Sequence, residues 1–320
     1  MIWILFLLLI LGLLALDLGV FHKDAHVVSM KQSLMWTLIW IGVAMLFGLG
    51  LFYIYKFNLF NINPSGHSPL DSLLKYYTGY VIEESLSLDN IFVIAMIFTF
   101  FKIEPKYQHN ILFWGILGAV FFRGIMILLG TSFIKQFHWS TYIFGLILIY
   151  SAIRLMTARH DNVDYYKSPV LKLLLKIYPI KWENRTSKYF IRENEKHYIT
   201  ASFATLVVIE FTDILFAVDS IPAILAITTD SFIVYTSNIF AILGLRNLYF
   251  FIANMMDRFR YMKFSLVFIL IFVGVKMILM NHYKFPTFVS MIFILGALLI
   301  GIVTSMISGE KDTAKLKKPL

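Results

Sequence analysis

Nine stretches of this sequence are long and apolar enough to cross a lipid bilayer as helices. A spanning helix needs about 20 mostly apolar residues, and hydropathy predicts spans at 2–21, 34–55, 73–101, 111–134, 141–157, 200–228, 233–256, 263–281 and 286–307. Hydrophobic residues make up 59% of the chain and charged residues 15%, which lies outside the usual range of soluble domains. The first stretch has neither a basic start nor a cleavage site, so we expect it to remain as a helix. The sequence therefore predicts an all-α polytopic membrane protein with about nine transmembrane helices.

Basic residues alternate between the connections of these predicted helices. One set of connections holds Lys23, Lys31, Lys102, Lys106, the bases from Arg159 to Lys196, Arg258, Arg260, Lys263, Lys311, Lys315, Lys317 and Lys318. The opposite set holds little beyond Lys56, Lys135 and Lys284. The positive-inside rule then places the N-terminus outside and the C-terminus in the cytoplasm. Much of the net charge of +9 is thus a topology signal with contact to anionic lipids of the cytoplasmic (inner) membrane, and nucleic-acid binding is not expected.

Two of the predicted spans carry clusters of acidic residues. The segment VIEESLSLDNIFVIAMIF (81–98) contains Glu83, Glu84 and Asp89, and VIEFTDILFAVDSIPAILAI (208–227) contains Glu210, Asp213 and Asp219. A charge at bilayer depth costs at least about 2.5 kcal/mol on insertion scales, so such groups normally face a polar cavity and serve ions or protons. We therefore predict that the chain carries a charged species across a membrane.

The main alternative is that the acids only pair with bases inside the membrane. Arg123 and Arg246 lie within predicted spans, and we expect each to neutralise an acid. Arg154 and Lys276 lie nearer to span ends, where long basic side chains extend to the interface. The acids outnumber the central bases, so pairing does not account for all of them. Asp17, near the end of the first span, is expected to be an interfacial acid.

The two acidic segments also belong to an internal repeat. Glu83-x5-Asp89-Asn90-Ile91 aligns with Asp213-x5-Asp219-Ser220-Ile221, FWGILG resembles IFAILG downstream, and AIRLM resembles GVKMI further on. Each unit has three helices, so the second enters the membrane from the opposite side, as in many secondary transporters. The predicted parts are two N-terminal helices (1–56), the first repeat (72–157), a cytoplasmic loop (158–198), the second repeat (199–282), a final helix (285–308) and a basic tail (309–320). The loop is expected to form short interfacial helices or a solvated connector, and the tail to be disordered.

Helical spacing limits how the acids can meet. Glu210 and Asp213 share a face, whereas Glu83 and Asp89 are about 120° apart on a straight helix. Either there are two sites, or the helices unwind between the acids. Pro222 favours unwinding in the second segment because its ring removes a helical hydrogen bond. In that case one central metal site would form from Glu83, Asp89, Glu210, Asp213 and Asp219, with Glu84, Asn90 and Ser220 beside it.

The available ligands are hard oxygen atoms, which suit manganese, magnesium and calcium better than copper or zinc. The chain contains no cysteine, and its histidines fall in predicted loops or at helix ends. Several carboxylates in one dry cavity cannot all stay ionised without a cation, because desolvation and mutual repulsion both favour protonation. We therefore expect no permanently bound cofactor, but a transported divalent cation whose movement is exchanged for protons.

The segments EESLSLDNIFV, RENEKHYITASFATLVVIEFTDILFAVDSIPAILAIT and SNIFAILGLRNLYFFIANMMDRF resemble the TerC family of integral membrane proteins, and most closely its Alx-like subgroup. The resemblance covers nearly the whole chain. It implies a nine-helix transporter of the LysE-type superfamily that exports Mn²⁺, with Ca²⁺ or another hard divalent cation as alternatives, and a link to tellurium resistance. The family's intramembrane acids fall on Glu83, Asp89, Glu210, Asp213 and Asp219.

Two other classes of function compete with transport. An intramembrane aspartyl protease needs a Gly-x-Gly-Asp context, and the contexts here are Ser-Leu-Asp-Asn and Ala-Val-Asp-Ser, so we do not expect an enzyme. The other class is a partner-dependent protein that supports tellurite tolerance or supplies metal to the secretion machinery. The sequence leaves that alternative and the oligomeric state open.

Overall fold

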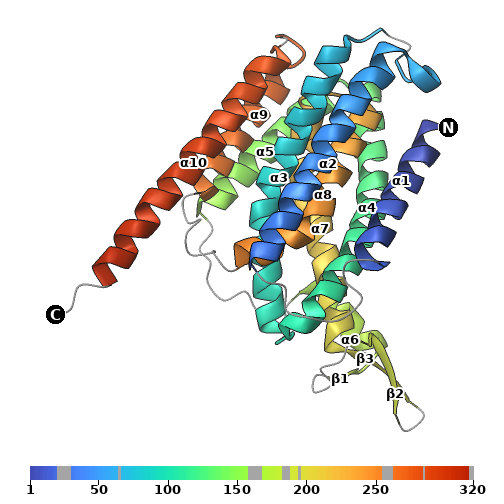
Figure 1. The fold of residues 1–320 in the computed structure, drawn as a ribbon, viewed down its shortest axis with the longest axis vertical. Coiled ribbons are helices and arrows are strands. Elements are labelled where there is room, and N and C mark those ends of the chain that lie inside the picture. Colours follow the sequence, from blue (N-terminus) through green and yellow to red (C-terminus); the bar gives the residue numbers. More distant parts are fainter. Residues whose placement is uncertain are drawn as a thin grey trace.

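The computed structural model describes residues 1–19, 30–63, 66–157, 168–181, 188–193, 196–253, 262–283 and 285–316. It is a bundle of long helices with a small sheet at one end (Figure 1). The helices are α1 (Ile2–Gly19), α2 (Met30–Lys56), the 3₁₀ turn η1 (Leu59–Asn61), α3 (Pro69–Phe100), α4 (Pro105–Gln136), α5 (Ser140–Thr157), α6 (Pro169–Ile177), α7 (Ala201–Leu225), α8 (Ser231–Ala253), α9 (Met262–Leu279) and α10 (Thr287–Leu316). Several bases used for the topology lie outside the described residues, among them Lys23, Arg159, Arg258, Arg260, Lys284, Lys317 and Lys318.

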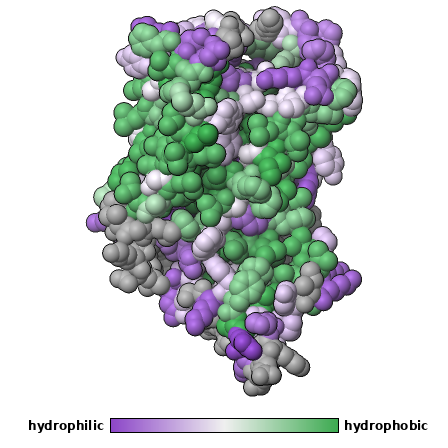
Figure 2. All heavy atoms as spheres, turned by 90° about the vertical axis from the view of Figure 1, so that its right-hand side faces the viewer, coloured by the Kyte–Doolittle hydropathy of each residue, from purple (hydrophilic) through white to green (hydrophobic). Residues whose placement is uncertain are grey.

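Seven described helices are long and apolar enough to cross a membrane: α2, α4, α5, α7, α8, α9 and α10. Helix α1 is a shorter apolar helix, and the 32-residue α3 carries the acidic cluster in its middle. Figure 2 shows a broad hydrophobic belt with hydrophilic residues gathered toward both ends of the molecule. The chain is therefore a multi-pass helical membrane protein, while the count of nine spans and their orientation stay predictions.

The helices of the two predicted repeats pack on each other in pairs. Helix α3 lies against α8, α4 against α7, and α5 against α9. The α5–α9 contact is close because Gly145 and Gly274 face each other: a Cβ on either would lie within 2.9 Å of the other's carbonyl oxygen. Exchanging α3 with α7, α4 with α8 and α5 with α9 leaves this set of pairs unchanged. An inverted repeat requires such a pattern, and the repeat itself stays a prediction.

Local chemistry explains where several helices begin. Helices α3 and α4 each have proline in the first turn, where no backbone N–H is needed. The Thr200 hydroxyl accepts a hydrogen bond from the Phe203 backbone and caps α7. Asp230 caps α8 by accepting bonds from the backbone N–H groups of Phe232 and Ile233.

One expectation is confirmed in part and two are wrong. The described part of the 158–198 connector contains an expected short helix, α6, followed by a three-stranded sheet that was not expected. Its strands are β1 (Ile180–Lys181), β3 (Lys196–Thr200) and β2 (Phe190–Glu193), in that order. The aromatic and β-branched residues Tyr198, Ile199 and Thr200 favour a strand at this point. Helix α10 continues through most of the expected disordered tail. Helix α7 runs unbroken through Pro222, three residues before its end, so the predicted unwinding does not occur.

Candidate functional site

Arg123 on α4 joins the two acidic helices. Its side chain is buried, and it forms ion pairs with Glu83 on α3 and with Asp213 on α7. The contact with Asp213 is bidentate: Nε lies 3.0 Å from Oδ2, and Nη2 lies 2.6 Å from Oδ1. Glu83 and Asp213 occupy the same position in the two acidic segments, and burial strengthens such pairs while making each charge depend on its partners. The prediction that Arg123 neutralises an acid is therefore confirmed.

Two neutral side chains complete the surroundings of this guanidinium. Arg123 Nη1 lies 3.3 Å from Asn238 Oδ1 and 3.4 Å from Ser220 Oγ. Asn238 on α8 also donates a 2.8 Å hydrogen bond from Nδ2 to Oε2 of Glu83. Sequence reasoning selected Ser220 but missed Asn238. The signal was present in the sequence, since an amide within a predicted membrane span needs polar partners.

Glu210 lies one turn before Asp213 and faces α4. Its carboxylate fits against the α4 backbone at Gly118, where a Cβ would collide with it, and Gly115 is the next neighbour on the same face. Oε2 of Glu210 is buried and makes no hydrogen bond to any described residue. The α4 glycines, which sequence reasoning also missed, thus make room for a carboxylate at the contact between α4 and α7.

Asp219 points to a different helix. The Ser151 hydroxyl on α5 donates a 2.6 Å hydrogen bond to its Oδ1, and the Arg154 guanidinium adds a favourable charge interaction. Arg154 itself is exposed, as expected for a base near a span end. Asp219 therefore lies on the α5 side of α7, whereas Asp213 on the same helix faces α4 and α3.

The remaining acids of α3 point away from Arg123. Glu84 accepts a 2.8 Å hydrogen bond from the Tyr80 hydroxyl and faces Gly244 of α8. Asp89 is partly buried and lies about 120° around the same unbroken helix from Glu83. Continuous helices therefore keep these acids apart, and the arrangement of the acids in more than one site stays a prediction.

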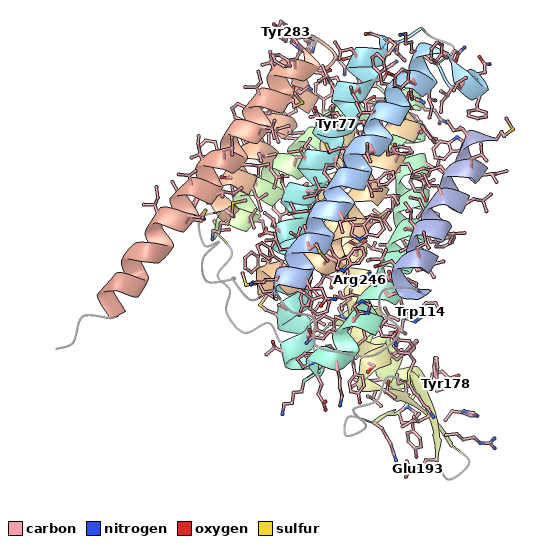
Figure 3. The ribbon with its side chains drawn as sticks, in the orientation of Figure 1. Tyr77, Trp114, Tyr178, Glu193, Arg246 and Tyr283 are labelled. Atoms are coloured by element: carbon pink, nitrogen blue, oxygen red, sulfur yellow. The ribbon has the colours of Figure 1, made fainter. Side chains whose placement is uncertain are left out.

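A cavity of about 30 Å³ lies beside Asp213, and Asn90, Ala119 and Arg246 also line it. A cavity of this volume can hold a water molecule. Arg246 on α8 forms a buried ion pair with Asp17 of α1, so the expectation that Asp17 is a simple interfacial acid is wrong. Figure 3 shows Arg246 inside the lower part of the bundle, on the side of the α6–sheet segment that carries Tyr178 and Glu193.

A larger, polar cavity of about 870 Å³ lies at the other end of the bundle. Asp71, Lys75, Lys135 and Asp230 are among the residues that line it. Lys276, expected to extend to the interface, is instead buried at this cavity, where it donates a 2.9 Å hydrogen bond to Ser290. The buried polar groups therefore lie between a small cavity beside Asp213 and a large one at the opposite end.

Of the five predicted metal-binding acids, the structure brings Glu83 and Asp213 together at Arg123, whereas Asp219 bonds Ser151 of α5 and Glu210 lies against Gly118 of α4. Within the part of the chain that it describes, no three His, Asp or Glu side chains lie close enough together to hold a metal ion. What meets in the bundle interior is a pair of carboxylates, an amide, a hydroxyl and one guanidinium. Every oxygen atom in this set is a hard ligand, of the kind that Mn²⁺, Mg²⁺ and Ca²⁺ prefer.

Comparison with known proteins agrees with this architecture. The model of the integral membrane protein TerC family matches residues 68–313. An uncharacterized membrane protein of Rickettsia bellii is 43% identical over 95% of this chain and 97% of its own length. One from Myxococcus xanthus is 42% identical over 96% of this chain and 92% of its length.

Alx of Salmonella typhi, described as a proposed membrane-bound redox modulator, is 36% identical over 92% of this chain and 90% of its own length. No solved structure matches the chain. The family match extends over most of the sequence, including both acidic segments and all of the helices from α4 to α9. The chain therefore belongs to the integral membrane protein TerC family.

Proposed function

We propose that this protein exports divalent metal cations, foremost Mn²⁺, across the cytoplasmic membrane. The observation that carries the proposal is the meeting of Glu83 and Asp213, from equivalent positions of two acidic helices, deep inside an apolar bundle. Charged groups at such depth are expensive and mark ion pathways. Their oxygen ligands match the preference of Mn²⁺, Mg²⁺ and Ca²⁺.

In this proposal the five acids act along a route. Glu83 and Asp213 form its centre with Asn238 and Ser220. Glu210 and Asp89 bind the cation in the part of the route that includes the small cavity. Asp219 binds it in the part next to α5. Inverted repeats would present this centre to the two sides of the membrane in turn. Protons taken up by the acids after the metal leaves would couple export to proton entry.

The description of the relative Alx as a proposed redox modulator fits this reading only indirectly. The present chain contains no cysteine, so it cannot form a thiol–disulfide pair. An effect on cellular redox balance would then follow from the supply of manganese. A tellurite-related role, or metal supply to secreted proteins through a partner, would use the same acids. The uptake experiment below distinguishes these roles from direct export.

The decisive experiment is Mn²⁺ uptake into everted membrane vesicles, in which export appears as accumulation. We expect the intact protein to accumulate Mn²⁺, and Asp89→Asn and Asp219→Asn to lose accumulation, because each change removes a charge and keeps a ligand oxygen. Glu104→Gln is the matched control, since Glu104 lies at the α4 start and pairs with Lys106 at the surface. No uptake by the folded intact protein would contradict direct export and favour a partner-dependent role.

Coupling is tested in the same vesicles with a pH indicator. We expect addition of Mn²⁺ to raise the internal pH, because protons leave the vesicles as the metal enters. Uptake that is electrogenic and leaves the pH unchanged would refute proton exchange while leaving export itself intact.

A further inference from the structure

The position of Arg123 has a meaning beyond a structural ion pair. Its buried guanidinium is surrounded by oxygen atoms from three other helices: Glu83 of α3, Asp213 and Ser220 of α7, and Asn238 of α8. Glu83, Ser220 and Asn238 are almost fully buried. A positive group therefore already occupies the point where the two acidic helices meet.

These surroundings would also suit a metal ion. Two carboxylates, an amide carbonyl and a hydroxyl are ligands that Ca²⁺ and Mn²⁺ accept. The bond from Asn238 Nδ2 to Glu83 Oε2 turns the amide oxygen toward Arg123 and holds the carboxylate in place. The two carboxylates carry two negative charges, and one guanidinium compensates only one of them. A divalent cation would compensate both.

The structure also provides space next to the guanidinium. A long side chain on a helix leans toward the residues three and four positions before it, which for Arg123 includes Ala119. Ala119 and Asp213 both line the 30 Å³ cavity. A small residue and a cavity that can hold a water molecule thus lie on the side toward which the Arg123 side chain leans, and withdrawal of the larger guanidinium would widen this cavity by moving the side chains that line it.

We propose that Arg123 is a tethered cation that exchanges with the divalent substrate at Glu83 and Asp213. This inference rests on the proposed function and adds how metal binding at this site is regulated. Metal binding displaces the guanidinium, and release of the metal lets it return, so the buried carboxylates always have a positive partner. The exchange keeps the affinity for metal low enough for release, because the site is open to metal only in the fraction of molecules in which Arg123 has withdrawn.

The test is Mn²⁺ binding to purified protein, measured by the electron paramagnetic resonance signal of free Mn²⁺. We expect Arg123→Gln to bind Mn²⁺ with a Kd lower than that of the intact protein by about ten-fold or more, since a competing state has been removed. Asp213→Asn added to Arg123→Gln should abolish this gain. Lys276→Gln is the matched control, because it removes another buried base, which lies at the large cavity and bonds Ser290, and it should bring no gain.

Arg123→Lys provides a second variant that keeps the charge. A lysine ammonium is a point charge that cannot bridge two carboxylates as a guanidinium does, so we expect a Kd between those of the intact protein and Arg123→Gln. Folded Arg123→Gln and Arg123→Lys that bind Mn²⁺ no more tightly than the intact protein would overturn the exchange. So would failure of both variants to fold even when Mn²⁺ is present, because a displaceable cation cannot be indispensable to the fold.

Failure of export and failure of the exchange are distinguishable. If the intact protein transports Mn²⁺ but Arg123→Gln shows no gain in binding, export stands and the exchange is refuted. If the intact protein transports no Mn²⁺ but Arg123→Gln gains Asp213-dependent binding, the exchange stands and export of Mn²⁺ is refuted.

Discussion

Glu83 and Asp213 hold equivalent places in two acidic segments 130 residues apart in the sequence and bind the same guanidinium, that of Arg123. One basic residue of α4 therefore fixes α3 relative to α7 in the middle of the bundle. Removing the guanidinium would leave two buried carboxylates without compensation, whereas removing one carboxylate leaves the other paired with Arg123. The first prediction below uses this asymmetry.

Glu83→Gln should weaken both fold and transport. It leaves Arg123 paired with Asp213 but removes the charged hydrogen bond between Arg123 and Glu83, and we expect the free energy of unfolding to fall by about 1.5–3 kcal/mol. Thermal unfolding in detergent measures the change. Glu104→Gln, at the exposed pair with Lys106, should cost less than about 1 kcal/mol. Equal effects of the two substitutions would contradict the buried pair.

Gly118→Ala should displace the Glu210 carboxylate. The added methyl group collides with it, and overpacking of this kind costs about 1–3 kcal/mol. We expect a lower melting temperature together with reduced Mn²⁺ uptake in everted vesicles. Gly296→Ala on α10 is the control, because no atom lies within 4 Å of the new Cβ there. If Gly118→Ala behaves like Gly296→Ala, the contact between Glu210 and α4 is not needed.

The ion pair between Asp17 and Arg246 should show energetic coupling. Both side chains are buried, so Asp17→Asn and Arg246→Gln should each destabilise the protein, and the double variant should lose less than the sum. Coupling between groups in contact is about 0.5–3 kcal/mol. A double-mutant cycle from unfolding in detergent gives this value. Additive losses would show that α1 is not held by this pair.

Asp71 should contribute a pH-dependent part of the stability. It lies before the predicted span 73–101, at the large cavity. Burial raises the pKa of Asp71, but hydrogen bonds from Lys75 at 2.6 Å and Thr287 at 2.9 Å outweigh it, so the pKa lies below its usual value. A lowered pKa gives stability that is present above the unfolded pKa of about 3.9 and is lost as the pH falls through the folded value.

We therefore expect Asp71→Asn to lower the melting temperature at neutral pH, and the difference from the intact protein to shrink below about pH 4. Thr287→Val removes one of the hydrogen bonds that lower the pKa of Asp71. It should therefore move the loss of stability on acidification to a higher pH. Melting curves recorded across the acid range measure both effects. A constant difference between Asp71→Asn and the intact protein at every pH would contradict the assignment.

The sequence by itself determined the class of the protein and located the carboxylates within its apolar helices. Apolar stretches of about 20 residues can be stable only in a membrane or a large core, and carboxylates within them are too costly to be incidental. Both properties depend on local composition, which is why hydropathy located the long helices. Helical periodicity added that straight helices could not bring all the acids together, because of the spacing of Glu83, Asp89, Asp213 and Asp219.

Only the tertiary structure decided which groups meet. Helical periodicity gives the direction of a side chain around its own axis but not the neighbour that packs there, so it could not pair Asp219 with Ser151, place Glu210 on Gly118 or add Asn238 to Glu83. Nor could it show that α7 stays helical through Pro222, because a proline near a helix end is tolerated when the surrounding packing holds the backbone. The contacts between helices depend on the whole bundle. They therefore decided that, of the six acids, Glu83 and Asp213 meet at Arg123.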